Sequence, residues 1–298
     1  MSKYSAAAAA LFALIATFGA PAVMQDPAAA WLVSLAAMTA FAGAVGWAIN
    51  NRPAGLIIDN RNRVSLSKLQ AMAWTLMVLS ALATAVITRI RLGFADPVDI
   101  TVPQELLAVM GISATSLVAA PMLLSLKANE DPPPGQVATT AAKLGDDGHG
   151  HGVGKVYART SASRASWLDL FRGDDTGNAA SPDLSKMQQF LITVVVLIIY
   201  ASGLWKAFAG PEFVTDESNA APFFTAFPAL STSMVWLVGI SHAGYLAYKA
   251  APHGASAPPA PVTTTVVAAV AAPLVAAVAT TDGPAAPPAP GGKKKAGV

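Results

Sequence analysis

The chain has 298 residues, of which 54% are hydrophobic and only 12% are charged. Soluble domains carry about a quarter charged residues, and a mean hydropathy of +0.50 also argues against that class. The formal net charge is +2. Cysteine is absent, and this absence excludes disulfides, thiolate nucleophiles, iron–sulfur clusters and cysteine zinc sites.

Six apolar segments meet or approach the length of about 20 residues that a helix needs to span the hydrocarbon. A membrane β-barrel would need alternating segments of about 10 residues, and these runs do not alternate. The sequence therefore predicts an all-α, polytopic helical membrane protein with spans at 6–22, 31–49, 69–88, 106–126, 187–205 and 226–248.

The first span has two interpretations. Lys3, an apolar run and then Ala20-Pro21-Ala22 are similar to a signal peptide with its small-residue cleavage site. Cleavage would leave five spans in the same orientation. We favour a retained helix that pairs with the second span, so that residues 1–50 form an N-terminal hairpin.

The distribution of Lys and Arg predicts the orientation. Cytoplasmic loops of membrane proteins are enriched in these residues. With the N-terminus inside, the outer loops keep only Arg89, Arg91 and Lys206, and all the others of the 19 Lys and Arg lie inside. We therefore expect both termini in the cytoplasm and the lipid bilayer as a partner.

A short polar sequence motif occurs twice, each time just before a span. Residues 66–70 read LSKLQ and residues 184–188 read LSKMQ, and Gly-Ile-Ser recurs at 111–113 and 239–241. This order predicts a duplicated two-span unit, in 51–127 and 167–249, with parallel repeats related by an axis along the membrane normal.

The motif also has features of a helix start at the membrane surface. Ser65 and Asp183 precede the two helices, where an oxygen can accept from free backbone amides as an N-cap. Lys68 and Lys186 are expected to extend to the cytoplasmic headgroups.

Polar residues recur inside the spans of both units. They could form hydrogen bonds between helices and fix how the bundle packs, or they could line a solute path. His242 is an ionisable residue in a span and so a functional candidate, but no carboxylate accompanies it there. The repeat polar positions are Gln70, Thr75, Ser113, Gln188, Thr193, Ser241 and His242.

Residues 128–166 join the two units and are rich in Pro, Ala, Gly and Ser. This composition predicts a disordered cytoplasmic linker. His149 and His151 beside Asp146 and Asp147 are weak metal candidates, since His and carboxylate do bind metals. The Gly-rich setting favours a solvated linker, so we expect neither a metal nor a cofactor.

The segment 167–178, WLDLFRGDDTGN, leads into the second unit. Trp167 and Phe171 could lie on the headgroup region with Arg172 toward lipid phosphate, which would turn Asp174 and Asp175 to the cytosol. The segment is predicted to be a short amphipathic helix, with a docking site for a cytosolic partner as the alternative.

Three segments carry a resemblance to known sequences. They are DNRNRVSLSKLQAMAWTLMVLSALATAVI at 59–87, FRGDDTGNAASPDLSKMQQFLITVVVL at 171–197 and GISHAGYLAYK at 239–249. Together they resemble a module of uncharacterised bacterial multi-pass inner-membrane proteins. The resemblance implies a bacterial inner-membrane protein with a two-repeat domain, and it implies no activity.

The chain lacks the features of an enzyme or an active transporter. It has no nucleophile-elbow motif, and no Asp or Glu falls in the core of a span, where proton-coupled transport would need one. We expect a non-enzymatic scaffold or anchor, without a nucleic-acid partner, whose cytoplasmic face docks a protein or assembles a homo-oligomer. The alternative is a channel or passive permease with a polar path at the repeat interface.

The Ala/Pro-rich segment 250–298 is predicted to be a disordered tail. Its part 262–280 is apolar enough for a seventh span as the alternative, but that would leave Lys293, Lys294 and Lys295 outside.

Overall fold

A computed structural model describes residues 3–210, 223–251 and 253. This part of the chain is mostly helical and all-α in class, with one small β-hairpin of antiparallel strands. The α-helices are α1 (Lys3–Val23), α2 (Pro27–Asn50), α3 (Leu66–Arg91), α4 (Gln104–Lys127), α5 (Gln136–Leu144), α6 (Leu184–Ala209) and α7 (Thr232–Ala250). The strands are β1 (Gly150–Val153) and β2 (Val156–Arg159), and the 3-10 helices are η1 (Gly55–Ile57), η2 (Ala162–Arg164) and η3 (Trp167–Phe171).

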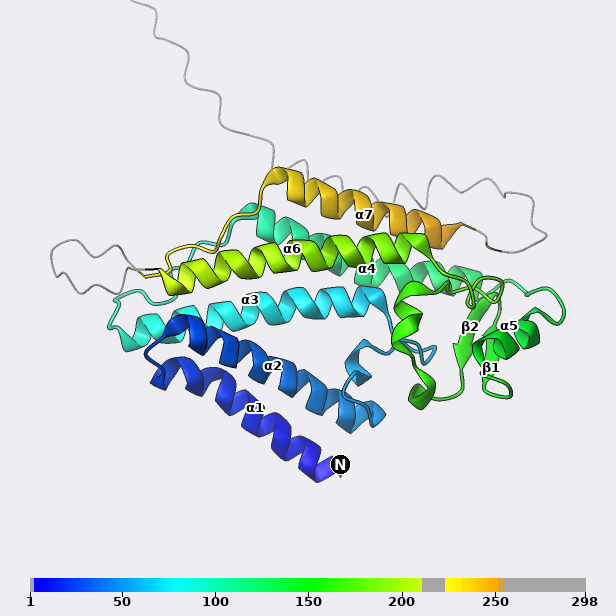
Figure 1. The fold of residues 1–298 in the computed structure, drawn as a ribbon, viewed down its shortest axis with the longest axis horizontal. Coiled ribbons are helices and arrows are strands. Elements are labelled where there is room, and N and C mark those ends of the chain that lie inside the picture. The colour runs from blue at the N-terminus through cyan, green and yellow to red at the C-terminus, as the bar shows by residue number, and fades with distance from the viewer. Residues whose placement is uncertain (1–2, 211–222, 252, 254–298) are drawn as a thin grey trace, which may run out of the picture.

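The long helices lie side by side, and a small lobe made of residues 51–65 and 128–183 sits at one end of the bundle (Figure 1). We call this the lobe end and the opposite end the distal end. Helices α3 and α7 each contact α4 and α6, so the four form a closed ring, and the α1–α2 hairpin packs against α3.

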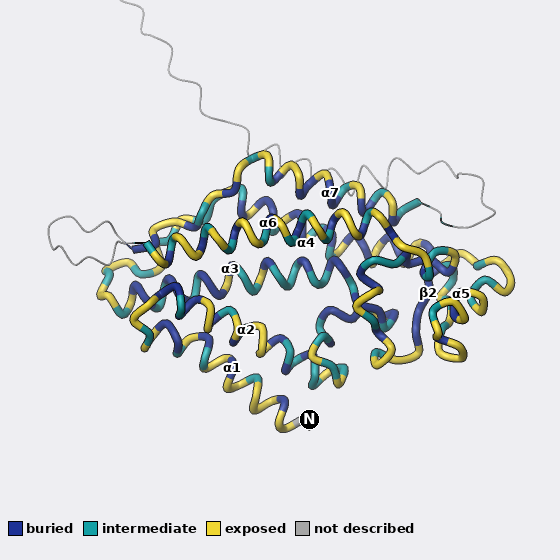
Figure 2. Tube along the Cα trace, viewed as in Figure 1, coloured by how far each residue is buried: buried dark blue, intermediate teal, exposed yellow. Residues whose placement is uncertain are grey.

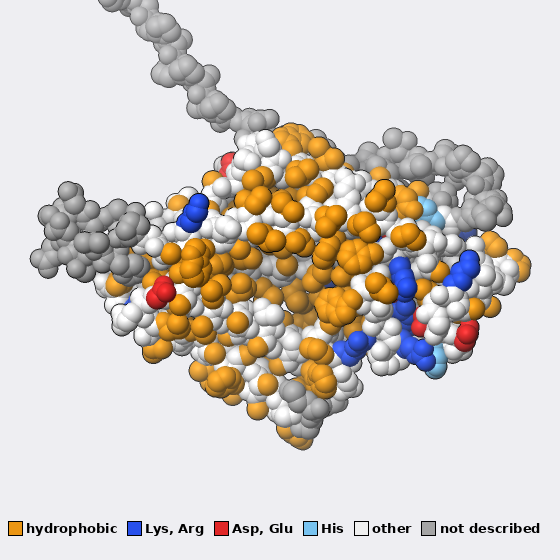
Figure 3. Space-filling model, viewed as in Figure 1, with side chains coloured by type: hydrophobic (Ala, Val, Ile, Leu, Met, Phe, Trp, Pro, Cys, Tyr) orange, Lys and Arg blue, Asp and Glu red, His pale blue; other side chains and the backbone are white. Residues whose placement is uncertain are grey.

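Five helices of the described residues are long and apolar enough to cross a membrane, namely α1, α2, α3, α4 and α6. The first five predicted spans each lie inside one of them. Apolar side chains cover much of the helical body, whereas Lys and Arg gather at the lobe end (Figure 3). Many of these apolar side chains are exposed (Figure 2), among them Leu79, Val118 and Ile198. The length and the surface of these helices indicate a helical membrane protein.

Helix α7 corresponds to the sixth predicted span, 226–248, but it differs from the other five. It is not among the helices that are apolar enough to cross by composition, because it carries several polar residues, including His242 and Lys249. It also begins later than predicted, at Thr232, because Ala226 instead forms a parallel β-bridge with Thr101 in the loop between α3 and α4.

Aromatic side chains pack the interior of the bundle. Trp31 of α2 stacks on Phe208 of α6 with ring centroids 5.7 Å apart, and Phe208 stacks on Phe224 at 4.6 Å. The Trp31 indole nitrogen donates to Ser80 Oγ of α3 at 3.2 Å. These contacts join the N-terminal hairpin to the four-helix ring.

Two glycines allow the lobe to approach the N-terminal hairpin closely. A Cβ added to Gly46 of α2 would lie 2.8 Å from the backbone nitrogen of Gly55, and one added to Gly55 would overlap the Gly46 carbonyl oxygen. Only glycine fits where two backbones come this close.

The prediction of a disordered linker at 128–166 is wrong. The segment contains α5, both strands and η2, and Tyr157 and Ala158 of β2 are buried. Its backbone amides pair with distant segments: Arg159 N donates to Arg61 O at 2.9 Å and Tyr157 N to Asp174 O at 3.0 Å. Composition does not reveal such pairing. Most of the predicted tail, including 262–280, lies outside the described residues.

Candidate functional site

The start of α3 is held by an N-cap and a lysine. Ser65 is the N-cap, as predicted, and its hydroxyl accepts from Lys68 N at 3.4 Å. The Ser65 amide donates to Ile57 O at 2.8 Å, and the Lys68 ammonium donates to Ile58 O at 2.8 Å. The lysine thus satisfies a carbonyl just after η1.

The start of α6 is built in the same way. Asp183 is the N-cap, as predicted, and accepts from Lys186 N at 3.1 Å. The Asp183 amide donates to Phe171 O at 2.7 Å, and the Lys186 ammonium donates to Arg172 O at 2.6 Å. The expectation that Lys186 extends to headgroups is wrong, because its side chain is buried among these partners.

The carboxylate of Asp174 lies at the centre of a buried charge network. Its Oδ1 is 2.9 Å from both Arg61 Nη1 and Lys186 Nζ, its Oδ2 pairs with Lys249, and Arg63 Nη1 is 3.9 Å away. Burial alone would raise the pKa of Asp174, but Lys186, Lys249 and Arg61 together lower it well below its usual value. The four cations come from the segment before α3, from α6 and from α7.

Asp169 of η3 forms a second centre beside the first. Its oxygens lie 3.4 Å from Arg63 Nε and 2.6 Å from Arg159 Nη1, and one of them also accepts from Ser166 N in a capping box. Burial would raise the pKa of Asp169, but Arg63 and Arg159 lower it. Arg159 also reaches Asp146 at 2.5 Å, so it joins η3 to the end of α5.

Asp175 neutralises the lysine that ends α4. Lys127 Nζ is 2.7 Å from Asp175 Oδ2 and also donates to Ala251 O at 2.6 Å. Burial raises the pKa of Asp175 against the attraction of Lys127. Its backbone amide donates to Asn178 Oδ1 at 3.0 Å, which closes the turn that carries both acids.

The prediction that Asp174 and Asp175 face the cytosol is therefore wrong. They are 6% and 3% exposed and they serve as counter-ions inside the protein. Of the other docking candidates, Trp167 is 55% exposed. Phe171 and Arg172 are partly buried, and Phe171 packs edge-to-face on Phe190 at 5.1 Å.

The four weak metal candidates are not brought together as a site. Asp146 is buried against Arg159, whereas Asp147, His149 and His151 are exposed. Nowhere in the described ranges do three or more His, Asp or Glu side chains gather closely enough to hold a metal ion.

A polar contact between α3 and α6 lies deeper in the bundle. Gln70 Nε2 donates to Thr193 Oγ1 at 2.7 Å, and Gln189 Nε2 donates to Gln70 Oε1 at 2.9 Å. The predicted partner Gln188 is exposed, so the register of that prediction is wrong by one residue. A buried face runs through Lys186, Gln189 and Thr193, and this helical spacing was a signal for Gln189 in the sequence.

The remaining repeat polar positions do not join this contact. Ser116 of α4 and Nδ1 of His242 in α7 lie 2.6 Å apart, and Ser113 and Ser241 are buried in those same two helices. Thr75 is exposed and donates to Ala71 O of its own helix. The seven positions thus divide between two helix pairs and the outer surface.

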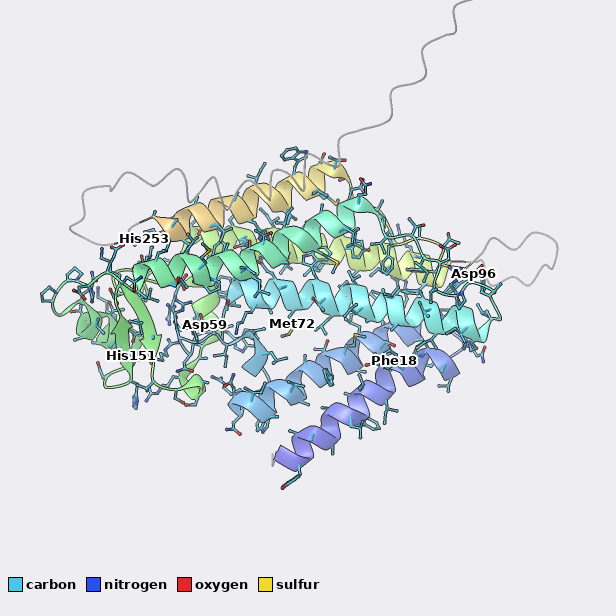
Figure 4. The ribbon with its side chains drawn as sticks, turned by 180° about the vertical axis from the view of Figure 1, so that it is seen from behind. Phe18, Asp59, Met72, Asp96, His151 and His253 are labelled. Atoms are coloured by element: carbon cyan, nitrogen blue, oxygen red, sulfur yellow. The ribbon has the colours of Figure 1, made fainter. Side chains whose placement is uncertain are left out.

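A cavity of about 370 Å³ lies at the lobe end beside Asp174. Figure 4 places two of its lining residues, Asp59 and His151, at this end and Asp96 at the other. Its lining includes charged groups from the network, the Lys68 side chain, parts of β1 and β2, and an apolar strip of α4.

Comparison with family models, curated proteins and solved structures finds no match for this chain. What the chain does is therefore inferred from its own residues. In the network each carboxylate already has cationic partners, and a carboxylate with a lowered pKa is a weak general base at neutral pH. The arrangement is suited to fixing the lobe onto the bundle.

Proposed function

We propose that this protein is a non-enzymatic scaffold of the bacterial inner membrane, whose helical bundle holds the lobe at the cytoplasmic face to dock a protein or assemble a homo-oligomer. One observation carries the proposal. Asp174 of the lobe binds Arg61, Lys186 and Lys249, which belong to segments far apart in the chain. Removing one partner of a buried pair leaves an uncompensated charge and is costly, so the network holds the lobe firmly.

The bundle is proposed to contain two parallel two-span repeats with α7 as a sixth span. The matching hydrogen bonds at the starts of α3 and α6 support the duplication. So does the end of each unit, where Lys127 and Lys249 pair with the neighbouring acids Asp175 and Asp174. Helix α7 contacts both α4 and α6, which supports a position inside the membrane bundle.

The lobe is proposed to face the cytoplasm. Lys and Arg gather at the lobe end (Figure 3), and cytoplasmic loops are the ones enriched in these residues. The resemblance of the two-span module to bacterial inner-membrane proteins gives the same location.

The docking surface is proposed to centre on Trp167 and Leu168 at the start of η3. They are 55% and 54% exposed. Their backbone is fixed, because Ser166 and Asp169 form a capping box and Asp169 is paired with Arg159. Aromatic residues such as Trp are enriched at the centres of protein interfaces, and a rigid pair of exposed apolar side chains suits a protein partner.

The geometry does not favour the channel or permease alternative. Gln70 and Thr193 are hydrogen-bonded to each other and buried, so they fill the space between α3 and α6. Thr75 and Gln188 point outward. These residues do not line one path.

Photocrosslinking in native membranes tests the proposal. Benzoylphenylalanine in place of Leu168 should give discrete crosslinked products, and a product of twice the chain mass would identify a homo-oligomer. The matched control carries the same probe in place of Val98, which is 73% exposed at the distal end and should give none of these products. Trp167→Ala should weaken the crosslinks from position 168.

Two results would overturn the scaffold. One is the absence of any protein crosslink from position 168. The other is selective solute flux through the purified protein in liposomes that Gln70→Leu abolishes, which would establish a permease.

A further inference from the structure

The cavity at the lobe end lies between the start of α3 and the last turns of α4. The β-hairpin of β1 and β2 contributes Val153, Val156 and Ala158 to the lining, and α7 contributes Tyr245 and Lys249. Its volume of about 370 Å³ falls within the range of about 300–1,000 Å³ that is usual for small-molecule sites.

The polar side of the cavity carries more positive than negative charge. Its cations are Arg61, Lys68, Lys186 and Lys249, and its carboxylates are Asp59 and Asp174. A wall with this excess of cations attracts an anion.

Among the four cations that line the cavity, Lys68 differs in having no carboxylate partner in the described part of the chain. Arg61, Lys186 and Lys249 all pair with Asp174. Lys68 has no carboxylate within ion-pair distance in the described part of the chain, and its ammonium donates to the carbonyl oxygen of Ile58. An ammonium has three donors, so two remain for a ligand.

The α4 residues that line the cavity are mostly apolar. They include Leu117, Ala120, Pro121 and Leu124. The cavity thus combines cationic and apolar side chains, and its lining comes from the helices α3, α4, α6 and α7 and from the lobe. Basic pockets between membrane helices at this depth suit anionic lipid headgroups.

We propose that this cavity binds a phosphate-bearing anion through Lys68, and that the anion is the headgroup of an anionic phospholipid. The Lys68 ammonium contacts the phosphate, Arg61 and Lys186 contribute positive potential, and the α4 wall receives the first part of the lipid chains. The inference does not depend on the scaffold function and stands if the docking surface fails its test.

The test uses the full chain, delipidated and purified in dodecyl maltoside. Phosphatidylglycerol, phosphatidylcholine and inorganic phosphate are titrated separately, with thermal unfolding and native mass spectrometry as the two readouts. Phosphatidylglycerol should raise the melting temperature and remain bound at a ratio of one per chain at low excess, whereas phosphatidylcholine should do neither.

Variants locate the effect at the cavity. Lys68→Gln should weaken phosphatidylglycerol binding by about tenfold, as expected for the loss of one charge-assisted hydrogen bond, and Lys68→Arg should retain it. The matched control Lys143→Gln removes an exposed charge from α5 and should bind as the unmodified protein does. Ser125→Trp fills the cavity from its α4 side without removing a charge, and should also weaken binding.

Each outcome decides the proposal. Saturable binding of inorganic phosphate alone, with the same dependence on Lys68, would support the anion site and assign it to a free phosphate instead of a lipid. Equal binding of phosphatidylglycerol and phosphatidylcholine, or equal effects of Lys68→Gln and Lys143→Gln, would overturn it. If Lys68→Gln does not fold, unimpaired binding in Ser125→Trp would overturn it as well.

Discussion

Lys127 at the end of α4 lies 2.7 Å from Asp175. The adjacent residue Asp174 takes the corresponding lysine of α7, Lys249, as one of its partners. Two neighbouring acids of the lobe thus bind the lobe ends of two helices that pack against each other. Ion pairs therefore attach the lobe to the bundle. Their lysines come from both halves of the chain, Lys127 from the first and Lys249 from the second.

Replacing Asp174 should destabilise the protein strongly. Asp174→Asn leaves Arg61, Lys186 and Lys249 buried without their shared counter-ion, and losing one partner of a buried pair costs about 3–5 kcal/mol. Thermal unfolding in detergent should show a large fall in melting temperature. In limited proteolysis, α5 and the β-hairpin of β1 and β2 should become accessible to protease before the long helices do.

Asp175→Asn is the matched control for that prediction. It is the same change one residue away, but burial already raises the pKa of Asp175, and Lys127 keeps the Ala251 carbonyl as a partner. It should cost clearly less than Asp174→Asn. Equal losses from the two variants would contradict the central role of Asp174.

Acid should loosen the lobe. The pKa values of Asp169 and Asp174 are lowered in the folded state, so their contribution to stability is fully present above the unfolded value of about 3.9. It is lost as pH falls from there through the lower folded values. Melting temperatures measured from pH 7 down to pH 3 should fall at the acid end.

Asp175 should act in the opposite direction. Its pKa is raised by burial, so the folded protein binds its proton more tightly than the unfolded chain and gains stability as pH falls through that range. Asp175→Asn removes this gain, so its melting temperature should fall more steeply with acid than that of the unmodified protein. A shallower fall would contradict the sign of this assignment.

The buried polar contact between α3 and α6 gives a test of helix register. Gln70→Leu leaves Gln189 and Thr193 without a partner and should cost about 0.5–2 kcal/mol, as for other hydrogen bonds between membrane helices. The controls are Gln189→Leu, which should cost a similar amount, and Gln188→Leu, which should cost little because Gln188 is exposed. Chemical unfolding in mixed micelles measures all three.

Much of the helical framework could be predicted from the sequence, because its causes are local. Uncharged apolar runs of spanning length predicted helices α1 to α4 and α6, and the N-caps Ser65 and Asp183 follow from side chains just before those runs. The register of α6 was also available, because Lys186, Gln189 and Thr193 recur at helical spacing. The prediction chose Gln188 because Gln188 aligns with Gln70 in the repeated LSK-x-Q motif. It did not consider which residues of α6 share one helix face.

The lobe could not be predicted in this way, because its causes are distant in the chain. The sequence GDDTGN has the composition of a solvated turn, and its two acids are buried against lysines that converge from three helices, namely Lys127, Lys186 and Lys249. The segment 128–166 has no apolar pattern of its own. It is ordered by ion pairs such as that of Arg159 with Asp169 and by backbone pairing with residues before α3.

The close approach of Gly46 and Gly55 should tolerate no side chain. Gly46→Ala places its Cβ 2.8 Å from the Gly55 backbone nitrogen, so the N-terminal hairpin must shift away from the lobe. The melting temperature should fall. Gly111→Ala is the matched control on α4, where a Cβ meets nothing within 4 Å, and it should be neutral or slightly stabilising because Ala is the better helix former.

Single cysteines can test the proposed orientation and the sixth span together, because the natural chain has no cysteine. With the lobe in the cytoplasm, Val98→Cys at the distal end should react with a membrane-impermeant maleimide in intact spheroplasts. Lys143→Cys in the lobe should react only after permeabilisation.

The decisive position is Ser233, which is exposed in the first turn of α7. If α7 crosses the bilayer beside α4, Ser233→Cys should label like Val98→Cys, because both lie at the distal end. Labelling only after permeabilisation would place the start of α7 on the lobe side and leave five spans. A reversal at positions 98 and 143 would instead invert the whole protein in the membrane.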